Sequence, residues 1–376
     1  MIDLEKLFFE LIRVAIGTQE RPTRLPLEDE WGKLYAMAQK QSLLGICFNG
    51  IQALGADSND GFARIGMSED LYFNWMGMAA QINMTNETVN KQCADLQKRL
   101  SADGLRSSIL KGQGVAALYS EKLRSLRQSG DIDIYVDCGR EKAIEYARSI
   151  QGDVDWDYKH LHLKVFDDTE VEMHYVPEVM FNLFKNRTLR NWAKTEEVRQ
   201  SIFSENGIGM VSPSAEFNLI FLLVHMCHHI MSEGCGLRQF MDYYFLLNSV
   251  NVEEYKADAC KMIDRLGMRN MAGGVMWVLR EAFGMDESSL LLPANEKAGR
   301  FLLADALRGG NFGKHDKSRR WGKSLYPIKL FCDWFTRDLH ILLNVSSDAM
   351  WYPVWVVYHF VWKRGWALRH GAALSR

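Results

Sequence analysis

Two carboxylates, Asp131 and Asp133, stand one residue apart in the segment Gly-Asp-Ile-Asp-Ile-Tyr-Val at 130–136. The alternation of polar and apolar residues predicts a β-strand that places both aspartates on one face and the isoleucines on the other. Two such charges repel each other unless a cation lies between them. Mg²⁺ takes oxygen ligands and usually keeps water and substrate phosphates as its other partners. The pair therefore indicates a phosphoryl-transfer site, although Asp-x-Asp alone is also common at solvated strand ends.

A candidate phosphate-binding turn lies upstream of the aspartates. Residues 107–114 read Ser-Ser-Ile-Leu-Lys-Gly-Gln-Gly, which predicts a short strand ending in a turn that contains Gly112 and Gly114. A helix is expected to start at 115–119. Backbone N–H groups at a helix N-terminus, unobstructed by Cβ atoms, suit the phosphates of a nucleotide. The segment is not a Walker loop, because the pattern Gly-x-x-x-x-Gly-Lys-Ser/Thr is absent.

A β-hairpin is predicted downstream, where residues 160–166 and 170–176 flank the polar turn Asp-Asp-Thr. In its second strand Glu170, Glu172 and His174 share one face, and apolar residues occupy the other. We expect this strand to bring a third carboxylate to the aspartate pair.

Together these segments resemble a known family. Leu-Lys-Gly at 110–112, Arg-Gln-Ser-Gly-Asp-Ile-Asp-Ile at 127–134 and Val-Glu-Met-His at 171–174 are similar to motifs of the nucleotidyltransferase superfamily. The resemblance is to its minimal DNA polymerase β-like fold, and specifically to a bacterial group of uncharacterised nucleotidyltransferases. One departure concerns the turn, which reads Lys-Gly-Gln-Gly where the superfamily usually has Gly-Ser or Gly-Gly.

The resemblance implies a role for each matching residue. Catalysis and metal binding fall on Asp131, Asp133 and Glu172, and Glu172 would also help to deprotonate an acceptor hydroxyl. Nucleotide binding is assigned to Lys111, Gly112, Gly114, Arg127, Gly130 and Arg238. For Lys111 and Arg127 a structural salt bridge remains an equal alternative to phosphate binding.

The implied reaction moves a nucleoside monophosphate from an NTP to an acceptor hydroxyl on a small molecule, a glycan precursor or a protein. Two ions of Mg²⁺ or Mn²⁺, roughly 3.5–4 Å apart, would stabilise the attacking and leaving oxygens. ATP is the donor only by default, and the acceptor is not specified. Substitution of either Asp131 or Asp133 by Asn is expected to abolish transfer while leaving the thermal midpoint unchanged or raised.

Composition is that of an ordinary globular protein. The chain has 376 residues and a formal net charge of −2, which gives no general attraction to nucleic acid or anionic membranes. Its seven cysteines include no Cys-x-x-Cys pair, and we expect reduced thiols rather than disulfides or a zinc site. The first residues lack a secretory n-region and no transmembrane segment is evident, so the cytoplasm is the expected location.

Three regions are predicted. They are a helical N-terminal region at 1–104, a nucleotidyltransferase core at 105–205 and a helical C-terminal domain at 206–376. Helices of the first region are expected at 7–16, 31–54 and 70–100, although Asn and Thr at 83–90 weaken the last prediction. The predicted fold class is α+β: an α/β core with a short mixed sheet and flanking helices, embedded in largely α-helical N- and C-terminal regions.

The C-terminal region adds two candidate site features. A helix predicted at 213–232 carries His225, His228 and His229, two of which would share a face. Because no third ligand is evident, we favour histidines that face the cleft or pack on the core over a metal site. In the next helix Arg238 either forms an i, i+4 ion pair with Asp242, worth about 0.3 kcal/mol, or faces the nucleotide. Both interpretations stay open.

Two further segments are interpreted conservatively. After a helix predicted at 293–308, Gly309 is expected to form a left-handed C-cap, and the basic loop that continues to Lys323 is expected to be a solvated surface run. Alternatively, this loop would position an acidic or phosphate-bearing acceptor. The uncharged aromatic run at 349–362 is shorter than the ~20 apolar residues that span a bilayer. We expect a helix that packs across the helical domain, with interfacial attachment as the alternative.

Two other functions compete with catalysis. A non-catalytic nucleotide-binding or scaffold protein of the same fold could lose any of the three carboxylates, yet all three are present. An RNA-modifying transferase is disfavoured because no basic domain with interleaved aromatic residues is evident.

Overall fold

The computed structural model describes residues 3–56, 61–207, 209–232, 234–311, 341–342 and 345–370. Up to the end of the sheet the elements are α1 (Asp3–Ile16), α2 (Glu28–Lys40), α3 (Leu44–Ile51), η1 (Gln52–Ala56), α4 (Gly61–Arg64), α5 (Glu69–Ala102), β1 (Ser107–Ile109), α6 (Gln113–Ala116), α7 (Glu121–Arg124), β2 (Ile132–Val136), α8 (Arg140–Gln151), β3 (His160–His162) and β4 (Val171–His174). Thereafter they are α9 (Leu183–Trp192), α10 (Glu196–Ile202), β5 (Ser204–Glu205), β6 (Val211–Ser212), α11 (Ala215–Ser232), α12 (Leu237–Asn248), α13 (Val252–Arg265), α14 (Arg269–Phe283), η2 (Glu287–Ser289), α15 (Glu296–Gly309), η7 (Ser347–Trp351) and α18 (Tyr352–His370). The predicted α+β fold, with a short mixed sheet between helical regions, is confirmed.

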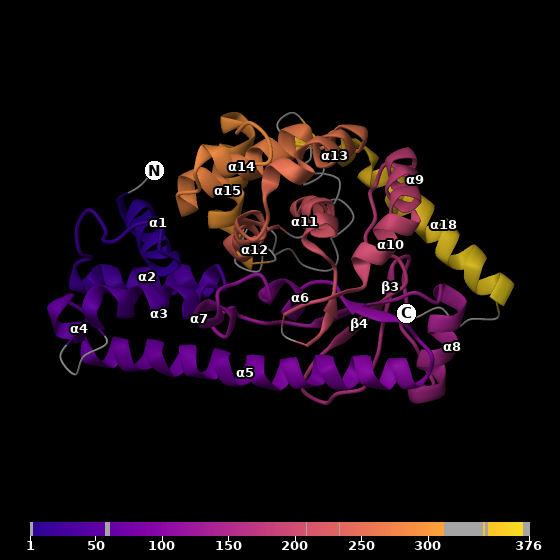
Figure 1. Ribbon diagram of the computed structural model, residues 1–376, viewed down its shortest axis with the longest axis horizontal. Coiled ribbons are helices and arrows are strands. Elements are labelled where there is room, and N and C mark those ends of the chain that lie inside the picture. Colours follow the sequence, from indigo (N-terminus) through magenta and orange to yellow (C-terminus); the bar gives the residue numbers. More distant parts are fainter. Residues whose placement is uncertain are drawn as a thin grey trace, which may run out of the picture.

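Helix α5 runs along one side of the molecule, past both the N-terminal helices and the sheet (Figure 1). Its buried residues recur at alternating spacings of four and three, which gives a continuous stripe along one face. Much of that stripe consists of Trp75, Ala79, Ile82, Asn86, Val89, Cys93, Leu96 and Leu100. The weak helix formers at 83–90 do not interrupt the helix, because tertiary packing of the stripe outweighs local propensity.

The sheet has the strand order β1-β2-β4-β3. Strand β2 pairs antiparallel with β1 and parallel with β4, while β3 and β4 form the predicted antiparallel hairpin. Because β2 has a neighbour on each side, its polar residue Asp133 is buried together with Ile132 and Ile134. The parallel pairing sets Asp133 directly beside Glu172. The sheet therefore aligns two of the three predicted carboxylates through backbone pairing alone.

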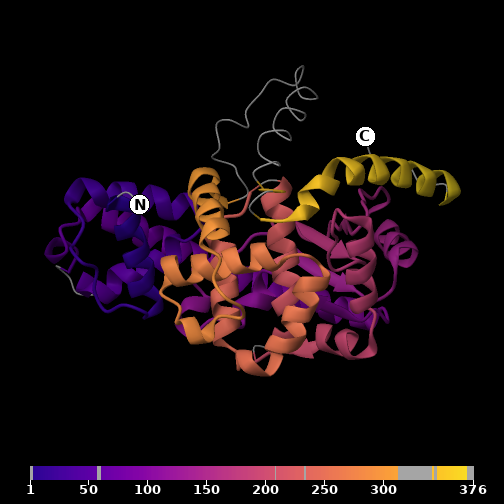
Figure 2. The same cartoon turned by 90° about the horizontal axis from the view of Figure 1, so that it is seen from above.

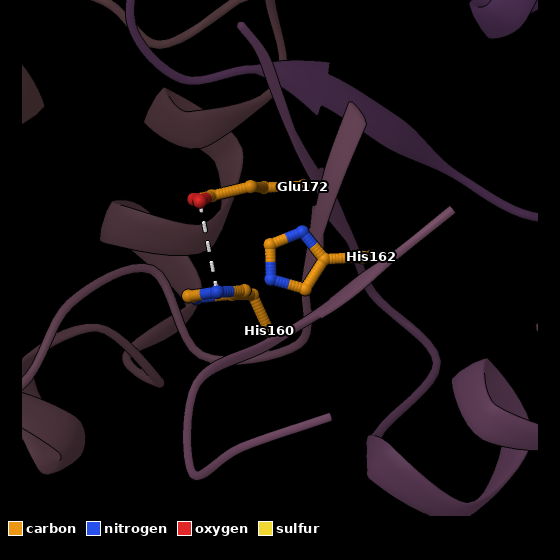
Figure 3. Close-up of side chains that lie close together, drawn as sticks. All are labelled: His160, His162 and Glu172. Atoms are coloured by element: carbon orange, nitrogen blue, oxygen red, sulfur yellow. Dashed lines mark ion pairs between the residues drawn. The ribbon is translucent and has the colours of Figure 1, made fainter. Parts of the chain in front are cut away.

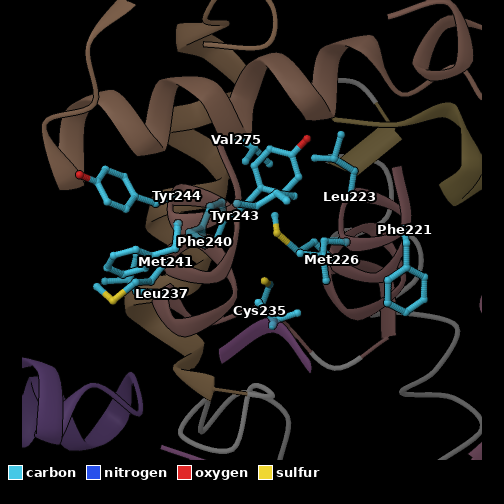
Figure 4. Packing of buried hydrophobic residues seen from close by; sticks show 14 of the residues in the cluster. Phe221, Leu223, Met226, Cys235, Leu237, Phe240, Met241, Tyr243, Tyr244 and Val275 are labelled. Atoms are coloured by element: carbon cyan, nitrogen blue, oxygen red, sulfur yellow. The ribbon is translucent and has the colours of Figure 1, made fainter. Parts of the chain in front are cut away.

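Helices α11 and α12 pack against each other over the sheet (Figure 1). Most residues of α11 are buried, because the helix packs against α10, α12 and α13. Figure 4 shows Met226 of α11 beside Phe240 and Tyr243 of α12, and the two aromatic side chains are fully buried. This apolar contact fixes α12 at one end of the sheet.

The C-terminal helix α18 lies along the edge of the molecule (Figure 2). Trp366 and Trp355 contact Trp156 and Tyr158 edge to face, with ring centroids 4.6 and 5.0 Å apart. The helix thus packs on the core beside β3, and the expected packing across the helical domain was wrong. None of the helices that the structure describes combines the length and apolar character needed to cross a bilayer.

Two local predictions need correction. The helix expected at 31–54 is divided into α2 and α3, because Ser42 adopts a left-handed φ of 56° that no α-helix accommodates. Gly309 ends α15, and the residue with a positive φ is Gly310, at φ 66° and ψ −165°, so the predicted left-handed helical cap at Gly309 was wrong. The predicted basic loop from Lys314 to Lys323 lies outside the described residues.

Candidate functional site

A cavity of about 460 Å³ opens between the sheet and helices α11 and α12. Both acidic and basic side chains line it, along with two glycines of the connecting loops. The predicted site residues on its wall are Lys111, Gly112, Arg127, Gly130, Asp131, Asp133, Glu172 and Arg238, and they are joined by His225, His228 and His229. Of the predicted nucleotide-binding residues, only Gly114 does not line this cavity.

The carboxylates form the acidic wall of the cavity. Lys111 Nζ lies 2.6 Å from Oδ1 of Asp133, and Nε2 of His174 lies 2.9 Å from the same oxygen. His174 Nε2 is also 3.4 Å from Oε2 of Glu172. One imidazole therefore links the two strands' carboxylates, and the role of His174 was not predicted from its sequence position.

Charge shifts the pKa of each group in this wall. The pKa of Asp131 is raised, first by the neighbouring charge of Asp133 and then by burial. Burial raises the pKa of both Asp133 and Glu172, but neighbouring groups outweigh it. Lys111 and His174 lower the pKa of Asp133. His174 and His160 lower the pKa of Glu172. Asp131 is thus the one carboxylate of the three whose charge is poorly compensated.

A buried ion pair forms another part of the wall. Arg127 donates from Nε and Nη2 to the two oxygens of Asp242, at 2.7 and 2.8 Å, and Tyr119 donates its hydroxyl to the same carboxylate. Arg127 Nη1 is buried and has no hydrogen-bond partner among the described residues. Arg127 therefore forms a structural salt bridge and still has a donor to offer to a ligand.

Arg238 reaches the cavity from α12. It donates from Nη1 to the carbonyl of Gln128 at 2.8 Å, which ties the helix to the loop before Asp131. Burial, and next the charge of Arg127, lower the pKa of the Arg238 guanidinium. Two buried guanidinium groups beside one cavity favour the binding of an anion there.

Glycine is required for a different structural reason at each of the two positions of the predicted phosphate turn. Gly112 has a left-handed φ of 56°, and it lines the cavity. Gly114 is buried in α6, where a Cβ atom would overlap the carbonyl oxygen of Ile109. Gly112 thus fits the predicted place beside a ligand, whereas Gly114 permits close packing of α6 on strand β1.

Polar residues of α5 hold the cavity loops in place. The buried amide of Asn86 donates to the carbonyls of Ser125 and Arg127 at 2.7 and 2.8 Å. Gln113, at the start of α6, donates to Oδ1 of Asn90 at 2.7 Å. Two asparagines of the segment that weakens the sequence-based helix prediction therefore hold the cavity walls, Asn86 the loop that carries Arg127 and Asn90 the start of α6.

Histidines of α11 form the wall beyond the carboxylates. His225 Nδ1 lies 3.0 Å from the buried carboxylate of Glu178, and its Nε2 lies 3.0 Å from Nε2 of His229. Lys159 Nζ contacts Glu178 at 3.1 Å. Burial, with the charge of Lys159 second, lowers the pKa of His228 to about 3. The helix thus presents histidines to the cleft, as favoured from the sequence, and the partner Glu178 was missed.

His160 and His162 were also missed as site residues. They are two residues apart on β3, so they share one face of the strand, and both approach Glu172 on the adjacent strand (Figure 3). Burial, opposed by the charge of Asp157, lowers the pKa of His160 to about 4. The His-x-His spacing was a signal, but only the strand register reveals that Glu172 lies beside it.

A mixed sheet that aligns carboxylates on a cavity also lined by lysine and arginine is typical of proteins that transfer phosphate-containing groups. The model of a family described as "Uncharacterised nucleotidyltransferase" matches residues 28–284, which is more than half of the chain. The chain therefore belongs to this family, and nucleotidyl transfer is its general class of activity. Comparisons with curated proteins and with solved structures gave no match.

Proposed function

We propose that this protein transfers a nucleoside monophosphate from an NTP to an acceptor hydroxyl, using a divalent ion held by Asp131, Asp133 and Glu172. The acceptor would be a small molecule, a glycan precursor or a protein. The observation that carries the proposal is the pairing of Asp133 with Glu172 across β2 and β4, on a cavity that Asp131 also lines.

The donor set fits Mg²⁺ or Mn²⁺. Carboxylate oxygens are the ligands that these hard ions prefer. The raised pKa of Asp131, caused first by the charge of Asp133, indicates repulsion that a cation would relieve. When bound, the ion would neutralise charge that develops on the attacking and leaving oxygens.

The residues around the cavity would accept the proton and bind the phosphates. The acceptor oxygen attacks the α-phosphorus, the bond to pyrophosphate breaks, and the hydroxyl proton passes to a carboxylate. Glu172 is our candidate for the proton acceptor, because it lines the cavity and lies beside Asp133 across the paired strands. Arg127 Nη1 and Arg238 would bind phosphate oxygens, and Gly112 would allow the chain to pass close to the nucleotide.

Transfer of an α-phosphate label tests the proposal. Purified full-length protein is incubated with each α-labelled NTP, Mg²⁺ and cell extract, and both label incorporation and pyrophosphate release are measured. We expect one NTP to label an acceptor with matching pyrophosphate release, and Asp131→Asn to abolish both. Nucleotide binding without pyrophosphate release would favour the scaffold alternative instead. Label in RNA that disappears on ribonuclease treatment would identify the RNA-modifying alternative.

A further inference from the structure

We infer that His160, His162 and Glu172 form a second metal site, selective for a divalent transition metal and distinct from the carboxylate site of Asp131 and Asp133. One ligand atom from each of the three side chains lies within 4.8 Å of the others. Figure 3 shows the three side chains close together, with the carboxylate of Glu172 facing the imidazole of His160. The inference rests on the proposed function in one respect, namely that Glu172 would serve both sites.

The backbone creates this cluster. Strands β3 and β4 are antiparallel, and His162 is the register partner of Glu172. His160 lies two residues earlier on β3 and therefore points to the same face of the sheet. The imidazoles of His160 and His162 have ring centroids 5.3 Å apart. Three side chains on two paired strands can thus approach one point without any loop rearrangement.

The distances are close to those that a metal requires. His160 Nε2 lies 3.7 Å from Oε1 of Glu172. Two ligands of a tetrahedral ion, each at ~2.1 Å, are ~3.4 Å apart, so a small movement would bring this pair to the separation that an ion requires. His160 and Glu172 also line the cavity, which would give water or a substrate oxygen access to the remaining coordination positions.

One of the two imidazoles has a carboxylate at hydrogen-bond distance from Nδ1. His162 Nδ1 is 2.9 Å from Oε1 of Glu170, whereas His160 Nδ1 lies 3.7 Å from Asp157 and has no hydrogen-bond partner among the described residues. A carboxylate beside one ring nitrogen favours a proton there and leaves the lone pair of the other nitrogen for a metal. His162 therefore has the carboxylate–histidine arrangement that is typical of metal ligands.

Glu172 can belong to both sites because its two oxygens face different groups. Oε1 faces His160, whereas Oε2 lies 3.4 Å from Nε2 of His174, which also contacts Asp133. Imidazole ligands suit Zn²⁺, Co²⁺ and Ni²⁺ and disfavour Mg²⁺, which takes oxygen donors. An ion at the histidines would therefore hold Glu172 in position without competing for the Mg²⁺ site of the aspartates.

Cobalt binding to the metal-stripped, untagged full-length protein tests the inference. Co²⁺ is titrated while its visible d–d absorption is recorded, in the presence of excess Mg²⁺. We expect one Co²⁺ per chain, an affinity at least about tenfold weaker in His160→Ala and His162→Ala, and no change in His359→Ala, the control on α18. Equal affinity in wild type and both cluster variants would overturn the site, as would displacement of Co²⁺ by Mg²⁺.

Three variants separate this inference from the proposed function. The Mg²⁺-dependent thermal shift with NTP should disappear in Asp131→Asn and persist in His162→Ala, while Co²⁺ binding should show the reverse pattern. Glu172→Gln should weaken both. If neither the wild type nor any variant shows a thermal shift with NTP, the nucleotide site is rejected. The metal site is upheld in that case if Co²⁺ still binds to the wild type and to Asp131→Asn but more weakly to His162→Ala. Intact Co²⁺ binding in Glu172→Gln would overturn the shared-ligand arrangement.

Discussion

Asp133 and Glu172 are register partners on parallel strands β2 and β4, and a single atom, Nε2 of His174, lies 2.9 Å from the first and 3.4 Å from the second. The imidazole therefore bridges two carboxylates that would otherwise repel each other. Lys111 Nζ completes the arrangement at 2.6 Å from Asp133. Asp133 consequently has a structural role in addition to the metal-binding role that we propose.

This arrangement changes the expected effect of the two Asp→Asn substitutions on stability. Asp133→Asn should lower the free energy of unfolding by roughly 3 kcal/mol, because it leaves the largely buried ammonium of Lys111 without its closest carboxylate. Asp131→Asn should leave the stability unchanged or raise it, because it removes a charge that is repelled by Asp133. The sequence-based expectation that both variants would behave alike is thus revised. Urea denaturation of the two variants at neutral pH would distinguish them, and equal stabilities would contradict this account.

Asn86 should be needed for both stability and nucleotide affinity. Asn86→Ala leaves the buried carbonyls of Ser125 and Arg127 without their donor, which should cost about 2 kcal/mol. NTP affinity should also fall, because the loop that carries Arg127 loses its anchor. The matched control is Asn83→Ala on the exposed side of the same helix, which should change stability by no more than ~0.5 kcal/mol. Calorimetric titration and chemical denaturation measure the two effects, and identical behaviour of the two variants would refute the role.

Gly114 should tolerate no side chain. In Gly114→Ala the new Cβ would meet the carbonyl of Ile109, and we expect a destabilisation of about 1–3 kcal/mol. Gly77 in the middle of α5 provides the control, because a Cβ atom added there would have no neighbouring atom within 4 Å. Gly77→Ala should raise the stability by up to ~1 kcal/mol. A neutral Gly114→Ala in thermal denaturation would show that α6 does not pack on β1 as described.

Partly buried His228 should make stability depend on pH. Its pKa is about 3 in the folded protein, first because of burial, whereas the unfolded chain binds the proton near 6.5. Between these values the unfolded state holds more protons, so the free energy of unfolding must fall as the pH decreases from 7 toward 4. His228→Gln should remove up to ~1.4 kcal/mol per pH unit from that slope. Denaturation curves between pH 5 and pH 7 give the slope, and an unchanged slope in the variant would contradict the prediction.

Sequence patterns were sufficient to predict the acidic wall but not its surroundings. Alternation along β2 and β4 placed Asp133 and Glu172 on strands, since strand periodicity is local. The partners Glu178 and His225 meet only through the packing of α11 on the segment after β4, and no local pattern encodes such a contact. Likewise, the aromatic residues of α18 indicated a helix that packs on the rest of the protein. They did not indicate that Trp366 would contact Trp156 of the core.

Two local features of the backbone, the end of α2 and the continuity of α5, were also not predictable from the sequence. Ser42 is not a residue type that signals a left-handed conformation, so the division between α2 and α3 had no sequence marker. Conversely, the asparagines of α5 weakened the prediction of a helix that is continuous in the structure. The side-chain amide of Asn86 donates to the carbonyls of the neighbouring loop, so it does not compete for the hydrogen bonds of its own helix.

The most direct test of the central claim is the thermal shift that each of the four NTPs causes in the full-length protein, with and without Mg²⁺, measured in parallel on Asp131→Asn. We predict that at least one NTP raises the melting temperature only when Mg²⁺ is present. The shift should vanish in Asp131→Asn even though that variant is at least as stable as the wild type without ligand. Stabilisation that is equal in the variant, or that needs no metal, would contradict a metal-dependent nucleotide site at these carboxylates.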